Sequence, residues 1–194
     1  MFSGCKKATK KGDRHMKHIL GVLCIQLMVI AGSAQDYIPV NEGSSVTFKI
    51  KNLGFNTDGS VKGLQGKIHF DPSNVSQISF DVSVDANTIS TDNEMRDDHL
   101  RKTDYFDVKN YPRIHFVSTS VTPSGKSGSY QITGKLTIKS TTREISFPFV
   151  AAPMGSDYIF SGQFKIDRKD FDIGGTSTIS NSLTVSLAVL AKKA

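Results

Sequence analysis

The sequence predicts an all-β protein: an antiparallel barrel of about eight strands with a short helical insertion near residues 92–101. Apolar and polar residues alternate with a period of two in about eight segments, the pattern of strands with one buried face. Turn signals separate these segments, and a single charged stretch, residues 91–116, interrupts the alternation. Regularly spaced short strands favour a barrel or a sandwich over a helical fold.

The first strand shows the alternation clearly, because Val46, Phe48 and Ile50 face one way and polar residues lie between them. Residues 56–59, Asn-Thr-Asp-Gly, are predicted to form the next turn, since these residue types tolerate positive φ. Pro148 cannot donate to a ladder, so an edge or a bulge is expected there. The predicted strands span residues 46–51, 64–70, 78–85, 113–118, 130–138, 145–149, 158–166 and 183–189.

The insertion is predicted to begin as a helix, because Thr91 and Glu94 have the S/T-x-x-E spacing of a capping box. About two charged turns follow. Pro112 then biases Tyr111 towards extended geometry before the next strand. A short helix in a series of antiparallel strands is expected to cover one end of the barrel.

Three alternating-strand architectures are compatible with the pattern: a soluble barrel, a sandwich and an outer-membrane barrel. An outer-membrane barrel needs aromatic girdles at both rims, but tryptophan is absent and the strand ends show no such banding. The polar faces carry long charges that suit the outside of a soluble barrel. These are Lys49, Lys67, Lys135 and Lys165.

Three glycines occupy positions on the predicted apolar faces where a larger side chain would fill space: Gly66, Gly134 and Gly162. An eight-stranded barrel either fills with its own side chains or leaves room for one ligand. These glycines therefore indicate either bulges or an internal tunnel.

Residues 1–34 are predicted to be a signal peptide that is removed. A basic segment leads into an apolar run at 19–31, followed by Gly32-Ser33-Ala34 as a small-residue cleavage site. The run is too short to span a bilayer. The alternative is a retained anchor in the membrane interface, and either Met1 or Met16 is the true start.

Removal of this leader lowers the net charge and takes away both cysteines. Residues 35–194 carry 18 basic and 17 acidic residues, a net charge of +1, so the high pI is no sign of nucleic-acid binding. Both cysteines, Cys5 and Cys24, lie in the leader. Disulfides and cysteine chemistry are therefore excluded for residues 35–194, which are long enough for a single domain.

Three ordered motifs carry a resemblance to a known family. The first runs from Arg96-Asp97-x-His99-Leu100 through Asp104-Tyr105-Phe106-Asp107-Val108 to Tyr111-Pro112-x-Ile114-x-Phe116. The second is Leu136-Thr137-Ile138 with Thr142-Arg143, and the third is Arg168-x-Asp170-Phe171-x-Ile173-Gly174. Together they resemble the signature of the YceI-like family over residues 37–190.

The resemblance implies an extended lipocalin-like barrel, exported from the cytoplasm, that holds a long isoprenoid-type lipid, either a polyprenyl lipid or a quinone, with no established reaction. The chain departs from the family pattern at Asn52, Tyr105 and Ser140, where His, Phe and Gly are usual. These departures bear on which ligand is held and how, and not on the fold.

Large apolar residues on the predicted inner faces are candidates for the wall of a ligand tunnel, and each is alternatively a simple core residue. The wall candidates are Phe48, Phe70, Phe80, Phe116, Leu136, Phe164 and Leu187. Candidates for the tunnel mouth and for binding a lipid head group are Arg96, Asp97, His99, Tyr105 and Arg143.

The charged cluster at residues 96–99 has two interpretations. Arg96 would pair with an anionic oxygen of the lipid, or His99 would donate a hydrogen bond to it. Alternatively Asp97 pairs with Arg101, or with Arg143 or Arg168, and only attaches the helix to the barrel.

An enzyme is not predicted, because the histidines are isolated and no metal-ligand spacing, nucleophile motif or nucleotide-binding loop is present. No metal or other cofactor is expected apart from a bound lipid.

The predicted function is an exported carrier or store of a long-chain isoprenoid-type lipid. The alternative is a secreted stress-response or interaction module with a filled core, and a hydrolase using Arg96 and His99 is a weaker third option. The expected partner is a long-chain lipid, and a homodimer is a further possibility. Neither nucleic-acid binding nor stable insertion into a membrane is expected after the signal peptide is removed.

Overall fold

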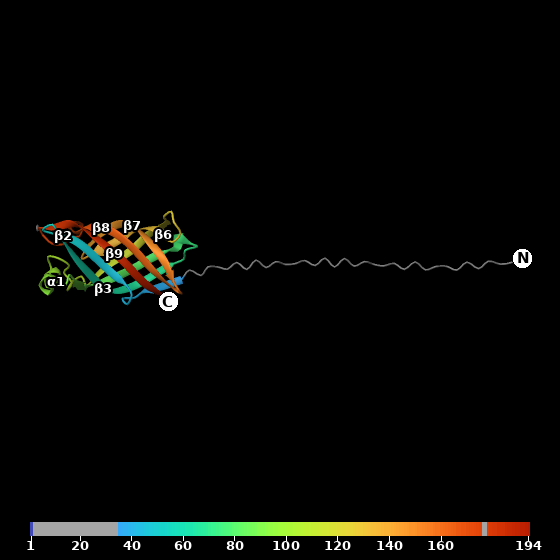
Figure 1. Cartoon of the computed structure of the whole chain (residues 1–194), viewed down its shortest axis with the longest axis horizontal. Helices are drawn as coiled ribbons and strands as arrows, with labels where there is room; N and C mark the ends of the chain where they lie inside the picture. The colour runs from blue at the N-terminus through green and yellow to red at the C-terminus, as the bar shows by residue number, and fades with distance from the viewer. Residues whose placement is uncertain (2–34, 176–177) are drawn as a thin grey trace. The chain divides into compact units, whose positions relative to one another are not determined.

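A computed structural model describes residues 35–175 and 178–194, together with Met1. In these ranges the chain forms an antiparallel barrel with one α-helix and two 3-10 helices (Figure 1). The strands are β1 Gln35–Pro39, β2 Ser45–Asn52, β3 Phe55–Phe70, β4 Ser79–Ser90, β5 Arg113–Pro123, β6 Ser129–Ile138, β7 Thr141–Met154, β8 Asp157–Asp167 and β9 Ile179–Lys193. The helices are η1 Val75–Gln77, α1 Glu94–Leu100 and η2 Arg168–Phe171.

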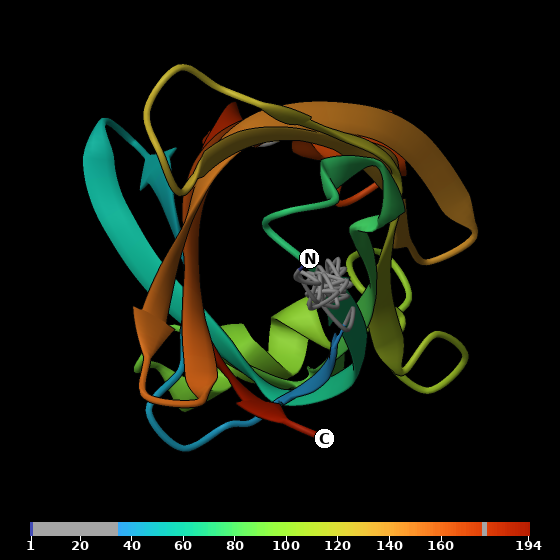
Figure 2. The ribbon, with the colours of Figure 1, turned by 90° about the vertical axis from the view of Figure 1, so that its right-hand side faces the viewer.

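The barrel closes because β3 pairs with β4 in addition to β2 (Figure 2). The described strands occupy eight positions around the ring, since β1 and β2 lie end to end between β3 and β9. The predicted fold, an antiparallel barrel of about eight strands with a short helical insertion, is therefore confirmed. The segment before residue 46, in which no strand was predicted, contributes the short strand β1.

The alternation of residues along the strands separates an apolar interior from a polar exterior. In β6, Tyr130, Ile132, Leu136 and Ile138 are buried at every second position. The four lysines assigned to the outer faces, at 49, 67, 135 and 165, are all exposed. Apolar side chains thus line the inside, the reverse of a barrel whose apolar face meets lipid.

The turn between β2 and β3 is not where the sequence predicted it. Residues 56–59 lie inside β3, and the turn is Leu53-Gly54, with φ of 51° and 84° between the paired Asn52 and Phe55. Gly59 pairs with Phe48, whose ring lies where a side chain at 59 would lie, because a Cβ there would be 2.2 Å from Cζ of Phe48. The glycine therefore makes room for a ring inside the barrel and does not make a turn.

The start of α1 also differs from the prediction. Asn93 is the N-cap, and its side chain accepts a hydrogen bond from the backbone N–H of Arg96 at 3.0 Å. The predicted capping box of Thr91 and Glu94 does not form, since Thr91 is buried and binds Asp97 instead. None of the helices in the described ranges is long and apolar enough to cross a membrane.

The ladder between β7 and β8 covers only part of their length. Residues 149–154 of β7 pair with 157–162 of β8. Nearer to α1, residues 141–148 pair with β6 alone and residues 163–167 pair with β9 alone. This gap in the ladder, which we call the seam, begins beside Pro148, where an edge or a bulge was expected. Side chains cover the seam from inside: the rings of Phe147 and Phe164 stack with centroids 4.5 Å apart.

Candidate functional site

The half of the barrel nearer to α1 encloses a cavity of about 250 Å³. Every strand from β2 to β9 contributes lining residues, and most of them are apolar. The two charged residues in the lining, Arg96 and Arg168, both lie at the α1 end. We call this end, marked by Asn52, Arg96, Tyr105 and Arg168, the mouth.

A second, smaller cavity of about 70 Å³ lies deeper in the barrel. It shares six lining residues with the first cavity, so the two spaces adjoin. The shared residues are Leu64, Val82, Phe116, Phe147, Leu187 and Val189. The apolar space therefore extends from the mouth towards the middle of the barrel.

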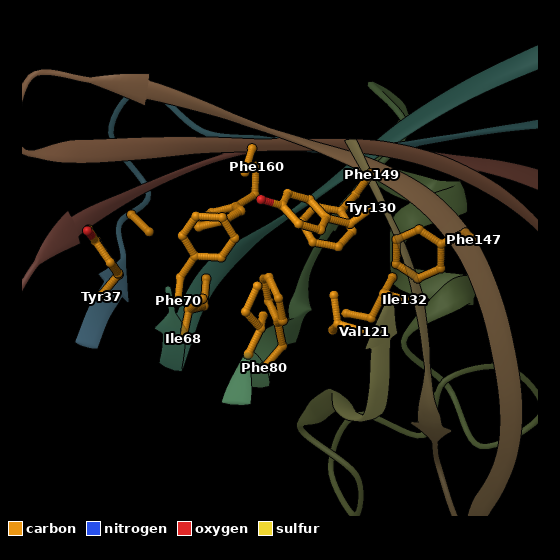
Figure 3. Close-up of a cluster of buried hydrophobic side chains, with 13 residues drawn as sticks. Tyr37, Ile68, Phe70, Phe80, Val121, Tyr130, Ile132, Phe147, Phe149 and Phe160 are labelled. Atoms are coloured by element: carbon orange, nitrogen blue, oxygen red, sulfur yellow. The ribbon is translucent and has the colours of Figure 1, made fainter. Parts of the chain in front are cut away.

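The end of the barrel away from α1 is filled by aromatic side chains (Figure 3). The ring centroid of Phe160 lies 5.1 Å from that of Phe70 and 5.4 Å from that of Phe80. Tyr130 stacks on Phe149 at 5.2 Å. Edge-to-face and offset stacking at these distances is favourable, so this end forms a packed plug and the cavity is closed there.

The predicted wall residues divide between these two regions. Five of them line the main cavity: Phe48, Phe116, Leu136, Phe164 and Leu187. Phe80 lines the small inner cavity, and Phe70 lies within the aromatic plug and lines neither space.

The three glycines that were predicted to lie on apolar faces differ from one another. Gly162 lines the inner cavity. Gly134 is buried beneath Phe116, since a Cβ there would lie 2.5 Å from Cζ of that ring. Gly66 is exposed, and its φ of 126° follows a register shift between β3 and β4. Both sequence interpretations therefore apply, a bulge near Gly66 and a place in the cavity wall at Gly162.

A hydrogen-bonded group of three residues attaches α1 beside the mouth. The backbone N–H of Thr91 donates to Oδ1 of Asp97 at 2.8 Å, and the Thr91 hydroxyl donates to the same oxygen. Nε of Arg96 donates to the Thr91 hydroxyl at 2.7 Å, and Nη2 donates to the Thr91 carbonyl at 2.7 Å. Arg96 is thereby fixed with its side chain in the cavity lining.

Asp97 is buried and ionised. Burial raises the pKa of its carboxyl, but hydrogen bonds from Thr91 and Ser90 and the positive charge of Arg101 together lower the pKa below its usual value of 3.8. The predicted pairing of Asp97 with Arg101 is wrong, because Arg101 makes its ion pair with Asp98 at 2.9 Å. Arg101 also donates to the carbonyls of Asn87 and Ile89, which ties α1 to β4.

The other two arginines proposed as partners for Asp97 have different surroundings. Arg168 is buried, and its guanidinium donates to the backbone carbonyl of Ile173, before β9, at 2.7 Å and to that of Ser180, at the start of β9, at 3.1 Å. Arg143 is exposed and does not line the cavity. Of the predicted mouth residues, the structure therefore brings Arg96 and Tyr105 to the cavity and leaves Arg143 outside.

His99 is exposed, and its ring lies against that of Tyr105 with centroids 4.8 Å apart. It does not line the cavity. No group of three or more potential metal ligands occurs in the described ranges.

Sequence reasoning missed three kinds of residue at the mouth. Arg168 lines the cavity although it was considered only as a partner for a carboxylate. Phe171 and Ile173 pack with Leu136 and Ile138 in a second apolar cluster under the mouth. Both residues stand in the third family motif, which was the available signal, but strand periodicity does not assign them to the interior. Leu53 was missed because the turn was misplaced.

Comparison with known proteins places these features in a family. The model of the YceI-like domain matches residues 37–191. The protein YceI of Escherichia coli O157:H7 is 33% identical over 168 residues, which cover 81% of this chain and 87% of that protein.

Two solved structures share the barrel. The crystal structure of BcnA from Burkholderia cenocepacia superposes with a TM-score of 0.75 at 28% identity, covering 79% of this chain and 99% of that one. A polyisoprenoid binding domain from Saccharophagus degradans superposes with a TM-score of 0.65 at 11% identity, covering 83% and 99%. The family match spans the whole barrel, from β1 to β9, and the chain belongs to the YceI-like domain family.

Proposed function

We propose that this protein is an exported binding protein that holds a long-chain isoprenoid-type lipid, a polyprenyl lipid or a quinone, inside its barrel. The lipid lies in the main cavity with its polar end at the mouth and its hydrocarbon tail directed towards the aromatic plug. Transport, storage and sequestration of the lipid are all consistent with such binding.

The observation that carries the proposal is the apolar cavity of about 250 Å³ with charged lining residues at one end only. Sites for small molecules are concave and mostly apolar, with a few polar groups that fix orientation. An apolar wall with Arg96 at one end suits a molecule with a long tail and one polar group.

Burial of the tail is sufficient to hold such a ligand. Each buried CH₂ group contributes about 0.8 kcal/mol, so a five-carbon isoprene unit contributes roughly 3 to 4 kcal/mol. Three units exceed the ~8 kcal/mol that corresponds to a micromolar complex. No polar network deep in the barrel is needed.

The comparison with the Saccharophagus degradans domain supports the same class of ligand, because that domain is described as binding polyisoprenoids. The two chains share the fold at 11% identity.

Export is part of the proposal and rests on residues 1–34, which lie outside the described barrel. Their basic segment, apolar run and Gly32-Ser33-Ala34 have the order of a secretory signal peptide. The barrel, residues 35–194, is then the exported form.

The alternative of an interaction module with a filled core is less well supported, because the half of the barrel at the mouth is hollow. A hydrolase using Arg96 and His99 is disfavoured by geometry. Arg96 lines the cavity, whereas His99 is exposed outside it.

The test is mass spectrometry of organic extracts from the purified protein. We expect a long-chain isoprenoid-type lipid in stoichiometric amount. A Leu183→Phe variant adds bulk to the main cavity wall and should contain several-fold less lipid.

Thr184→Phe is the matched control, because it adds the same ring to the adjacent position of β9, between the outward-facing Lys49 and Lys165. Its lipid content should equal that of the wild type. Wild-type protein that is repeatedly free of lipid, and that also fails to bind added polyprenyl lipids or quinones, would contradict the proposal.

A further inference from the structure

The turn between β2 and β3 combines an unfavourable backbone conformation with an exposed apolar side chain. Leu53 has φ of 51°, in the left-handed region that two-residue hairpin turns require. Asn, Asp and Gly adopt this conformation readily, whereas Leu does so at an energetic cost. The register of β2 and β3 places a turn here but does not require a leucine in it, and strained residues of this kind occur preferentially at functional positions.

Three large apolar side chains project from the described barrel more fully than any others apart from Met1. Leu53 is 68% exposed, Phe55 is 79% exposed and Met95 is 85% exposed. We call these three residues the rim patch. Isolated exposed apolar residues are common on proteins, but these three all belong to segments at one end of the barrel.

All three belong to elements at the mouth. Asn52, next to Leu53, and Arg96, next to Met95, both line the main cavity. The tip of the β2–β3 hairpin and α1 lie at the same end of the barrel in Figure 1. The rim patch therefore borders the end of the cavity at which a ligand would pass.

We propose that the rim patch inserts into the interfacial region of a lipid bilayer, so that the mouth faces the membrane. This inference rests on the proposed function, since a bound lipid would then move between bilayer and cavity without crossing water. Apolar side chains on a protruding tip, next to a lysine, suit the boundary between headgroups and acyl chains. Here Lys51 is exposed beside the turn.

A second protein is a poorer occupant for this surface. Three side chains of this size offer roughly 400 Å² of apolar surface, about half of the ~800 Å² per partner in a standard stable interface. Charge is also not the main driving force, because residues 35–194 carry a net charge of only +1 and Lys49 is paired with Asp58 at 3.2 Å. Insertion of apolar groups is then the principal contribution to binding.

The experiment is co-sedimentation of purified protein with vesicles of phosphatidylcholine, and with vesicles that also contain phosphatidylglycerol. The wild type is compared with a Leu53→Asn, Phe55→Ser double variant. Asn tolerates positive φ, so the turn should form at least as well as in the wild type, and thermal unfolding checks this. All variants are prepared in the same form, so that residues 1–34 contribute equally.

The matched control is an Ile38→Asn, Met154→Ser double variant. These side chains are 50% and 45% exposed and lie at the plugged end of the barrel. We expect the rim variant to lose at least ~10-fold in its partition onto both kinds of vesicle, because two large apolar side chains no longer enter the bilayer. The control should retain wild-type partitioning.

Equal vesicle binding by the wild type and the rim variant would overturn the inference. So would a rim variant that loses self-association in size-exclusion chromatography while its vesicle binding is unchanged, since the patch would then be a protein interface. Lipid content is measured in the same preparations. A wild type that binds vesicles through the rim patch but takes up no lipid would refute the proposed function and leave this inference standing.

Discussion

Asp97 is a buried residue that helps to hold α1 in place. It is 5% exposed and accepts two hydrogen bonds from Thr91, which in turn holds Arg96. We expect Asp97→Ala to lower the free energy of unfolding by about 1–3 kcal/mol, because buried donors on Thr91 lose their acceptor. Urea unfolding measures this loss, and Asp98→Ala, on the exposed side of α1, should change it by less than about 0.5 kcal/mol.

We also expect the effect of Asp97→Ala on the free energy of unfolding to depend on pH. The pKa of Asp97 is lowered in the folded protein, so its contribution to stability is fully present above the ordinary value of 3.8 and is lost as the pH falls through the folded value. The difference in stability between wild type and Asp97→Ala should therefore be constant near neutral pH and shrink below about pH 4. A difference that grows on acidification would contradict the assignment.

Arg96 is expected to select the polar end of the ligand. Nε and Nη2 are held by Thr91, and no partner for Nη1 is found within the described ranges. We expect Arg96→Ala to weaken binding of a polyprenyl phosphate by about 10-fold or more, as for a lost hydrogen bond between charged groups. Binding of a quinone with a similar tail should change by less than about twofold. Arg143→Ala, at an exposed position, is the control in a titration of both lipids.

At the residue scale, the sequence predicted the cavity wall better than the mouth. Alternation assigns Phe48, Phe116 and Phe164 to the inside, because a period of two is a property of the strand itself. The mouth is made by residues whose roles depend on tertiary contacts. Thr91 has the spacing of a capping residue, yet the buried carboxylate of Asp97 competes for its hydroxyl and its N–H, and Asn93 caps the helix instead.

At the scale of elements, the β2–β3 hairpin shows why a turn signal was misread. Asn56, Asp58 and Gly59 favour turns, but the apolar face of β2 must pair with that of β3, and Phe48 needs a partner without a side chain. Pairing of Phe48 with Gly59 sets the register, and Leu53-Gly54 is left to form the turn. Register decides between competing turn signals wherever one face of a strand is buried.

The seam between β7 and β8 predicts uneven protection of backbone amides. Residues 163–167 of β8 pair with β9 alone, whereas residues 157–162 pair on both sides. Hydrogen exchange measured by NMR should therefore be faster, by at least ~10-fold, for those amides of 163–167 that point to the seam. Amides of 163–167 that point to β9 provide an internal comparison. Uniform protection along β8 would mean that the seam is closed in solution.

For the molecule as a whole, one barrel is divided into a packed half and a hollow half. Phe70 is 2% exposed and its ring contacts those of Tyr130, Tyr158 and Phe160, whereas Phe48 is half-buried beside the main cavity. We expect Phe70→Ala to cost about 3–5 kcal/mol of stability and Phe48→Ala to cost about half as much. Urea unfolding of both variants, without added lipid, measures the difference. Equal losses would argue that stability is spread evenly along the barrel.

This division could not be read from the sequence. Phe70 and Phe48 occupy equivalent positions in the alternating pattern, and both were predicted to line a tunnel. The difference lies in how far each ring is from the mouth and in which side chains reach it across the barrel, and strand periodicity carries no such information. The longer strands and their inward faces follow from the local pattern, whereas the placement of empty space does not.

The pairing of β1 with the end of β9 brings Tyr37 opposite Lys193, and the N–H of Ala194 donates to the carbonyl of Asp36 at 2.9 Å. Both boundaries of the barrel domain are therefore neighbours at the plugged end. A fusion partner, an affinity tag or a bead coupled at the carboxyl terminus would be attached on the side away from the opening. Immobilised in this way, the domain would present its entrance freely to extruded liposomes or detergent micelles.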